Sequence, residues 1–150
     1  MLGRLATWLR LLGYDTTYGS HLGGPALLRH ARREGRIVLT RQRRPRRELD
    51  LPVIFVASDD FRAQVRQVLD TLGLDPFTRL FSRCSCCNQP VVATPRPAVA
   101  GLVPPYVLAT QDHFVRCPRC GRIYWPATHY AHVYAELRRM GFEPPPGVAA

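Results

Sequence analysis

Cys84-Ser85-Cys86-Cys87 and Cys117-Pro118-Arg119-Cys120 are the two stretches that decide how the second half of this chain folds. Each C-x-x-C pair can wrap two thiolates around one ion through a tight turn, and two such knuckles complete a tetrahedral site that is closed to substrate. Gly121 follows the second pair directly and suits the turn, because glycine adopts positive φ at little cost. We therefore predict a structural zinc site held by Cys84, Cys87, Cys117 and Cys120.

The chain has a fifth cysteine, Cys86, which is either a bystander or a replacement for Cys84 in an off-register knuckle. A redox-active C-x-x-C is the alternative to zinc, but redox pairs come singly at a strand-to-helix junction. His113, His129 and His132 lie near the site in sequence and are not needed where four thiolates are available. A closed four-thiolate site does no chemistry, so its expected role is to fold a domain too small to hold itself together.

The first half alternates helical periodicity with short apolar runs, which predicts an α/β domain with a parallel sheet. Helices are expected at residues 2–12, 25–34 and 61–72, ended by Gly13, Gly35 and Gly73. The third begins after the capping stretch Ser58-Asp59-Asp60. Short strands are expected at residues 14–18, 37–39 and 53–57.

From Phe81 onward the pattern changes to cysteine pairs, prolines and short β-type runs at residues 91–92 and 106–108. A last amphipathic helix runs from Tyr130 to Met140 and stops at Gly141. The predicted organisation is an α/β domain at 1–79, a zinc ribbon with a C-terminal helix at 80–141 and a flexible tail at 142–150.

The net charge is +10, and all 21 basic residues are arginine. A GC-rich genome explains the missing lysines but not the excess of positive charge. Arginine binds phosphate through a planar fork of donors, so the composition favours nucleic acid as a partner. Five arginines of one loop are the candidate phosphate contacts, with a merely solvated loop as the alternative: Arg41, Arg43, Arg44, Arg46 and Arg47.

No apolar run approaches the roughly 18–20 residues that span a bilayer, and the opening residues lack the layout of a secretory signal. We therefore expect a cytoplasmic protein with no membrane partner. Five cysteines in such a chain favour metal ligation over disulfides, because the cytosol keeps thiols reduced. The sequence names no protein partner.

Several motifs together resemble the Mut-seven C-terminal RNase domain family. They are Met-Leu-Gly-Arg-Leu-Ala-Thr-Trp-Leu-Arg-Leu-Leu-Gly-Tyr-Asp at 1–15, Glu-Gly-Arg-Ile-Val-Leu-Thr-Arg at 34–41, the two C-x-x-C pairs, and Cys-Gly-Arg-Ile-Tyr-Trp-Pro-Ala-Thr-His-Tyr at 120–130. The resemblance implies a PIN-like three-layer domain fused to a zinc ribbon. It also implies attack on RNA by an acidic cluster holding Mg²⁺ or Mn²⁺.

The chain departs from that family at the positions of its acids. In relatives a strand ending in aspartate precedes the Met-Leu-Gly-Arg motif, so the first strand is expected to be missing here unless translation starts further upstream. Gly23 and Gly24 stand where relatives carry an aspartate before the second helix. Thr40-Arg41-Gln42 replaces their Thr-Arg-Asp.

Asp59 and Asp60 are the acids that follow directly on a strand's carboxyl end, where ligands of an open α/β sheet gather. They are the candidate catalytic residues, with a helix N-cap as the alternative. Glu48 and Asp50 lie in the basic loop and are further candidates. We expect an RNA-binding PIN-like protein with a degenerate metal site. The alternatives are an active Mg²⁺- or Mn²⁺-dependent ribonuclease and a non-enzymatic protein-interaction module.

Tyr124 and Trp125 directly follow the second knuckle. Aromatic rings beside arginines can stack on the bases of single-stranded nucleic acid. The alternative is that they form the small core of the ribbon or its contact with the other half.

Overall fold

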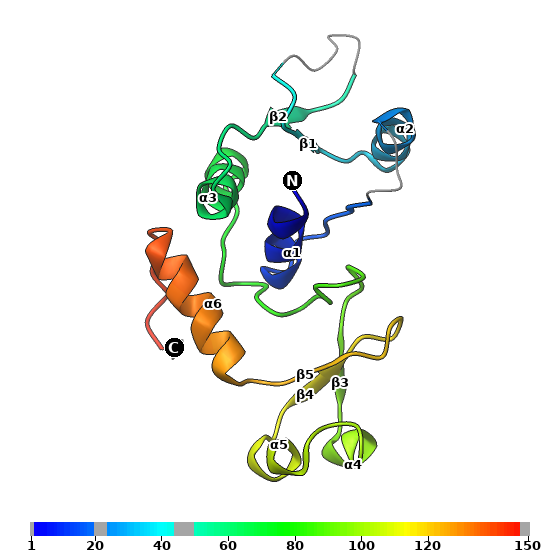
Figure 1. Ribbon diagram of the computed structural model, residues 1–150, viewed down its shortest axis with the longest axis vertical. Helices are drawn as coiled ribbons and strands as arrows, with labels where there is room; N and C mark the ends of the chain where they lie inside the picture. Colours follow the sequence, from blue (N-terminus) through cyan, green and yellow to red (C-terminus); the bar gives the residue numbers. More distant parts are fainter. Residues whose placement is uncertain (1, 20–23, 44–49, 148–150) are drawn as a thin grey trace. The chain divides into compact units, whose positions relative to one another are not determined.

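The computed structural model describes residues 2–19, 24–43 and 50–147 (Figure 1). These residues form two compact units that interleave along the chain. The first unit comprises Met1–Ala6 with Thr17–Leu74, and the second comprises Thr7–Thr16 with Asp75–Ala150. The division into domains at 1–79 and 80–141 and the flexible tail stay predictions.

The first unit contains a two-stranded parallel sheet, as predicted. Strand β1 (Val38–Thr40) pairs with β2 (Val53–Phe55) in a register that places Val38 opposite Val53. The pairing brings the carboxyl ends of both strands to one edge, so the residues that follow β1 and β2 emerge side by side.

Helices α1 (Gly3–Leu11), α2 (Gly24–Glu34) and α3 (Phe61–Leu72) lie where the apolar periodicity predicts them. Each is followed by a glycine with positive φ: 89° at Gly13, 62° at Gly35 and 62° at Gly73. A left-handed residue at this position lets its amide bond a carbonyl of the last turn, which ends the helix.

Helix α3 has a complete set of end signals. The Asp60 carboxylate accepts a hydrogen bond from the Ala63 amide at 3.0 Å, and the Gly73 amide donates to carbonyls of the last turn. Its buried face carries Phe61, Val65, Val68 and Leu69, which supply most of the apolar burial of this helix.

The second unit contains a three-stranded antiparallel sheet in the order β3 (Val92–Thr94), β4 (Phe114–Arg116) and β5 (Ile123–Tyr124). Two short helices, α4 (Arg96–Val99) and α5 (Pro105–Thr110), connect β3 to β4. A small core forms where these elements meet, from Val99, Val103 and Phe114 with Val107, Leu108, Ile123 and Trp125 packed against them.

The last helix, α6 (Thr128–Arg139), was predicted from the apolar face at Tyr130 to Met140. Val133 and Leu137 are fully buried. Gly141, with φ of 88°, follows the helix end as expected.

Two sequence expectations about strands are wrong. Residues 14–18 form no strand, because the Thr16 amide bonds the Asn88 side chain and the Thr16 carbonyl bonds Arg10 instead of a neighbouring strand. The run Tyr106–Leu108 lies in α5. Pro105 occupies the first helical position there, where a missing amide is no loss, and it starts the helix.

Candidate functional site

The two cysteine pairs fold into matching knuckles. In the first, the Cys84 amide donates to the Gln89 carbonyl at 2.8 Å and the Asn88 amide donates to the Cys84 carbonyl at 2.9 Å. In the second, the Cys117 amide donates to the Arg122 carbonyl and the Gly121 amide to the Cys117 carbonyl, both at 2.9 Å. Each loop thus closes on itself and turns both of its sulfurs to the same side.

The four predicted ligands come together. The Sγ atoms of Cys84, Cys87, Cys117 and Cys120 all lie within 4.8 Å of one another. Three of the separations are 3.4 Å for Cys87–Cys117, 3.5 Å for Cys84–Cys87 and 3.7 Å for Cys84–Cys120. Metal–sulfur bonds of about 2.3 Å in a tetrahedron place sulfurs about 3.8 Å apart, so the cluster fits a structural metal such as zinc.

Hydrogen bonds to the sulfurs set unequal acidities within the cluster. Burial raises the pKa of the Cys84 thiol, but the Tyr124 hydroxyl, 2.9 Å away, and nearby amides outweigh it and bring the pKa to about 6. Burial and then the neighbouring sulfurs raise the pKa of Cys87. Thiolates this close repel one another, so all four ionise together only around a cation.

Cys86 is exposed and stands outside the four-sulfur group, which leaves the predicted register of the first knuckle in place. Its carbonyl faces inward. Arg10, a buried residue of α1, donates to that carbonyl at 2.8 Å, to the Ser85 carbonyl at 3.2 Å and to the Thr16 carbonyl at 2.8 Å. The Arg10 guanidinium therefore holds the first knuckle against the segment that follows α1.

Asn88 completes this support. Its side-chain amide donates to the Asp15 carboxylate at 2.6 Å, and its side-chain oxygen accepts from the Thr16 amide at 3.0 Å. Sequence reasoning missed both Arg10 and Asn88, because the contacts that tie the first knuckle to the opening segment join residues more than 70 positions apart. The one available signal was that the opening motif and the cysteine motifs occur in the same chain.

At the edge of the parallel sheet, Arg41 and Asp59 form an ion pair. The Arg41 guanidinium, which follows β1, donates to the Asp59 carboxylate at 2.5 Å. It also donates to the carbonyls of Val56, Ala57 and Ser58, which follow β2. Arg41 thus fixes the loop that leads to α3, and the candidate catalytic Asp59 faces a guanidinium.

The structure describes some of the other candidate residues at this edge of the sheet. Asp60 caps α3, Gln42 and Arg43 are exposed, and Asp50 is exposed. Within residues 2–19, 24–43 and 50–147, the four cysteines are the one group of three or more possible metal ligands found together. Five residues of the predicted sites lie outside the described residues: Gly23, Arg44, Arg46, Arg47 and Glu48.

The chain thus combines an α/β unit that contains a parallel sheet with a second unit built around a four-cysteine cluster. The sequence matches the model of the Mut7-C RNAse domain over residues 1–137, so the chain belongs to that family. Comparisons with curated proteins and with solved structures gave no match. Among the described residues, no helix is both long and apolar enough to cross a membrane.

Proposed function

We propose that this chain is an RNA-binding member of its ribonuclease family, with a PIN-like three-layer first domain and a zinc-loaded ribbon. We further propose that the sheet edge no longer forms an efficient Mg²⁺ or Mn²⁺ site. The observation that carries the second statement is the contact of Arg41 with Asp59. A guanidinium at that carboxylate supplies the positive charge that a divalent ion would otherwise bring, and it repels such an ion.

Two further features support the loss of catalytic metal. The Asp60 carboxylate is used to cap α3, and a neutral residue, Gln42, follows Arg41. Phosphodiester hydrolysis by metal ions needs several carboxylates around the cation. Asp59 and Asp60 alone supply too few anionic oxygens unless Glu48 or Asp50 joins them.

The family and the charge of the chain both support RNA as the ligand. The excess of ten positive charges is carried by arginine, whose fork of donors suits phosphate. We place the phosphate contacts at the five arginines of the loop after β1: Arg41, Arg43, Arg44, Arg46 and Arg47. Arg41 remains in the proposed contact set, although its guanidinium also holds the loop before α3.

A nuclease assay with Mg²⁺ and Mn²⁺ titration tests the catalytic statement. We expect purified protein to leave a labelled single-stranded RNA uncut at all metal concentrations. Family membership favours the opposite result, an active ribonuclease. Metal-dependent cleavage that disappears in the Asp59→Asn, Asp60→Asn double variant would establish that alternative and reject ours.

The salt dependence of RNA binding tests the proposed contacts. The logarithm of affinity falls with the logarithm of salt at a slope near −0.7 per phosphate contact for single strands. The Arg43→Gln, Arg44→Gln variant should therefore bind more weakly, with a slope flatter by about 1.4. Arg29→Gln, Arg32→Gln on α2 removes the same charge from exposed positions and should leave the slope unchanged.

Exposed apolar side chains in the second unit favour one other function. Leu102 and Tyr106 are 59% and 76% exposed. Large apolar groups in solvent are typical of protein-docking surfaces. A protein-interaction module would bind RNA only through its overall charge, so Arg43→Gln, Arg44→Gln and the α2 control would change the affinity and the salt slope equally.

A further inference from the structure

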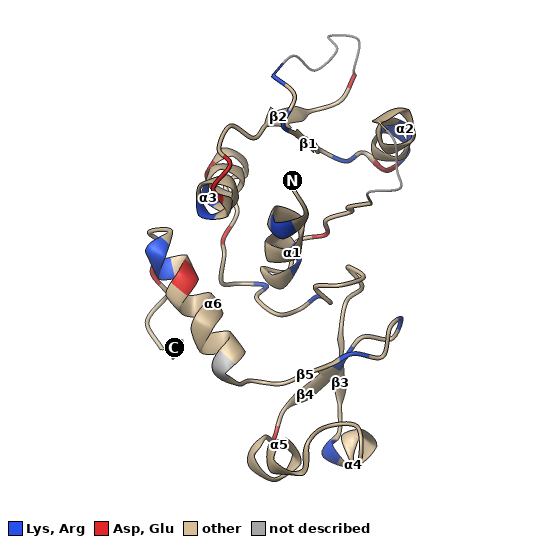
Figure 2. Cartoon of the chain, viewed as in Figure 1, with Lys and Arg blue, Asp and Glu red and all other residues tan. Residues whose placement is uncertain are grey.

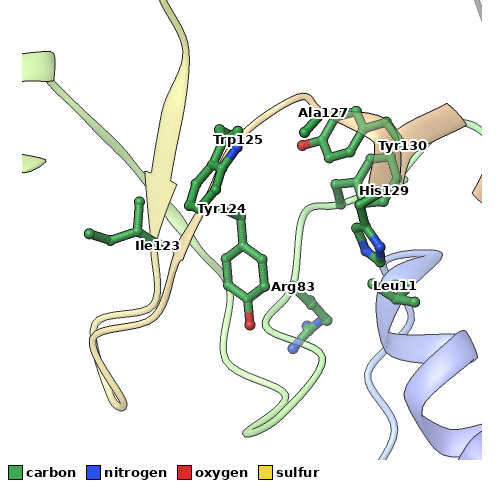
Figure 3. Close-up of a pocket in the computed structure, with 9 residues that line it drawn as sticks. Leu11, Arg83, Ile123, Tyr124, Trp125, Ala127, His129 and Tyr130 are labelled. Carbon is green, nitrogen blue, oxygen red and sulfur yellow. The ribbon is translucent and has the colours of Figure 1, made fainter. Parts of the chain in front are cut away.

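A pocket of about 120 Å³ lies in the second unit (Figure 3). Its volume is on the order of one six-membered ring, since an apolar cavity of about 150 Å³ holds benzene. Tyr124 joins the two sites, because its ring lines the pocket while its hydroxyl bonds the Cys84 sulfur. The ribbon that forms the metal site therefore also builds this pocket.

Aromatic rings line the pocket from two directions. Tyr124 and Trp125 come from β5 and the residue after it, and Tyr130 comes from the first turns of α6 (Figure 3). Phe81 also lines the pocket, and its ring stacks on that of Tyr130, with ring centroids 3.6 Å apart and planes 8° apart. Aromatic side chains on two sides of a space of about one ring are suited to a flat aromatic ligand.

The backbone at this pocket is strained. Phe81 has φ of 62°, a left-handed conformation that is uncommon for a bulky side chain. Its amide donates to the Leu11 carbonyl at 2.7 Å, which holds the residue in place. Residues with a strained backbone are common at ligand sites, where the surrounding structure holds the unfavourable φ angle in place.

Arg83 is the one arginine among the described residues that line the pocket. Arg83 lines the pocket and donates from one guanidinium nitrogen to the Asn88 carbonyl at 2.7 Å, and a guanidinium carries five N–H groups in all. Residues 76–127 contain six arginines and one acid, Asp112, which pairs with Arg96. The loop between β4 and β5 shows blue without red in Figure 2.

We propose that this pocket binds one unpaired pyrimidine base of single-stranded RNA. The base stacks between the β5 aromatics and Tyr130, Arg83 donates to a carbonyl oxygen of the base, and the neighbouring arginines contact the flanking phosphates. The inference rests on the proposed function, RNA binding, and adds the place where a base is held. A pyrimidine is favoured because the space accommodates one ring, whereas a purine has two.

The ligand itself provides the sharpest test, because it leaves the protein unchanged. Binding of the zinc-loaded chain is measured by fluorescence anisotropy with labelled eight-nucleotide strands of equal charge. One strand is oligouridylate, one is wholly abasic, and two carry a single uridine or a single adenosine among abasic positions. We expect the abasic strand to bind about tenfold more weakly than oligouridylate, and the single uridine to restore most of the loss. The single adenosine should restore less.

Equal affinity for the abasic strand and oligouridylate would overturn the pocket while leaving RNA binding intact. Absence of binding to every strand would instead reject the proposed function. The two failures are therefore distinguishable. Restoration by adenosine as strong as that by uridine would reject the preference for a single ring.

A matched pair of variants on α6 locates the base. Tyr130→Leu removes a pocket wall, whereas Tyr134→Leu removes a ring that stacks on Phe77, outside the pocket. Tyr130→Leu should weaken oligouridylate binding about tenfold with an unchanged salt slope, because stacking releases no counterions. Tyr134→Leu should bind within twofold of the parent. If the zinc-loaded Tyr130→Leu and Tyr134→Leu variants bound oligouridylate equally well, the base would not lie in this pocket. If Tyr130→Leu fails to fold, the comparison of oligouridylate, abasic and singly substituted strands still decides the proposal.

Discussion

Asn88 and Gly121 occupy the same position in the two cysteine knuckles. Each donates its amide to the carbonyl of the first cysteine of its pair at 2.9 Å, and each has positive φ, 65° for Asn88 and 75° for Gly121. Asparagine tolerates this conformation better than most residues. It also carries a side chain, which here bonds Asp15 and Thr16. The first knuckle is thus tied to a distant segment, whereas glycine in the second knuckle offers no such bond.

Replacing Asn88 separates these two roles. Asn88→Gly keeps the left-handed backbone but loses both side-chain hydrogen bonds, so we expect the free energy of unfolding to fall by about 1–3 kcal/mol. The zinc content should stay at one per chain. Urea denaturation and metal analysis measure the two quantities, and an Asn88→Gly variant as stable as the parent would contradict a supporting role for the side chain.

Arg10 should matter far more than Arg4, although both are arginines of α1. Arg10→Met leaves the carbonyls of Thr16, Ser85 and Cys86 without their donor in a buried position, and we expect a loss of at least about 2 kcal/mol. Arg4→Met removes a guanidinium that lies 3.5 Å from the Phe61 ring centroid at an exposed site, which costs about 0.5–1 kcal/mol. Similar denaturation midpoints for the two variants would be inconsistent with the hydrogen bonds described.

Two glycines that end helices make a second matched pair. A Cβ on Gly13 would lie 2.1 Å from the Arg79 carbonyl oxygen and 2.4 Å from the Arg79 Cβ, whereas a Cβ on Gly35 would meet no atom within 4 Å. Both residues have positive φ, so each alanine variant bears about 1–2 kcal/mol of backbone strain. Gly35→Ala should cost about that amount. Gly13→Ala should cost more than about 3 kcal/mol or prevent folding, as thermal melting will show.

Metal content distinguishes the fifth cysteine from the four ligands. Cys86 is exposed and outside the sulfur cluster, so Cys86→Ser should retain one equivalent of zinc. Cys87→Ser removes one of four sulfurs, and we expect it to lose the metal together with the cooperative melting of the second unit. A strong chelator should have the same effect on the parent protein. Loss of zinc in Cys86→Ser would show that the knuckle uses the other register.

Local signals in the sequence were sufficient for the metal cluster and for most helices. The C-x-x-C spacing fixes which sulfurs can share an ion, and a glycine after each apolar stripe marks where α1, α2, α3 and α6 end. The parallel pairing of β1 and β2 also followed from the alternation of helices with apolar runs. These features depend on residues within a few positions of one another.

The features that escaped prediction depend on distant partners. Residues 14–18 have the composition of a strand, yet Arg10 and Asn88 take the backbone groups of Thr16 that a strand would pair. The run at Tyr106–Leu108 is β-branched and aromatic in part, but Pro105 starts a helix that places Val107 and Leu108 against a small core. Nor does any pattern show that Arg41 pairs with Asp59, since the two lie on loops after different strands.

The division of the chain into interleaved units limits how this protein can have been assembled. The unit with the four-cysteine cluster takes Thr7–Thr16 from the beginning of the chain, so a gene fragment starting at Asp75 would encode both knuckles without Arg10, Asp15 or Thr16. Recombination that moved such a fragment into another gene would produce a ribbon without the residues that support its first knuckle. The opening helix and the cysteine pairs are therefore expected to be inherited together.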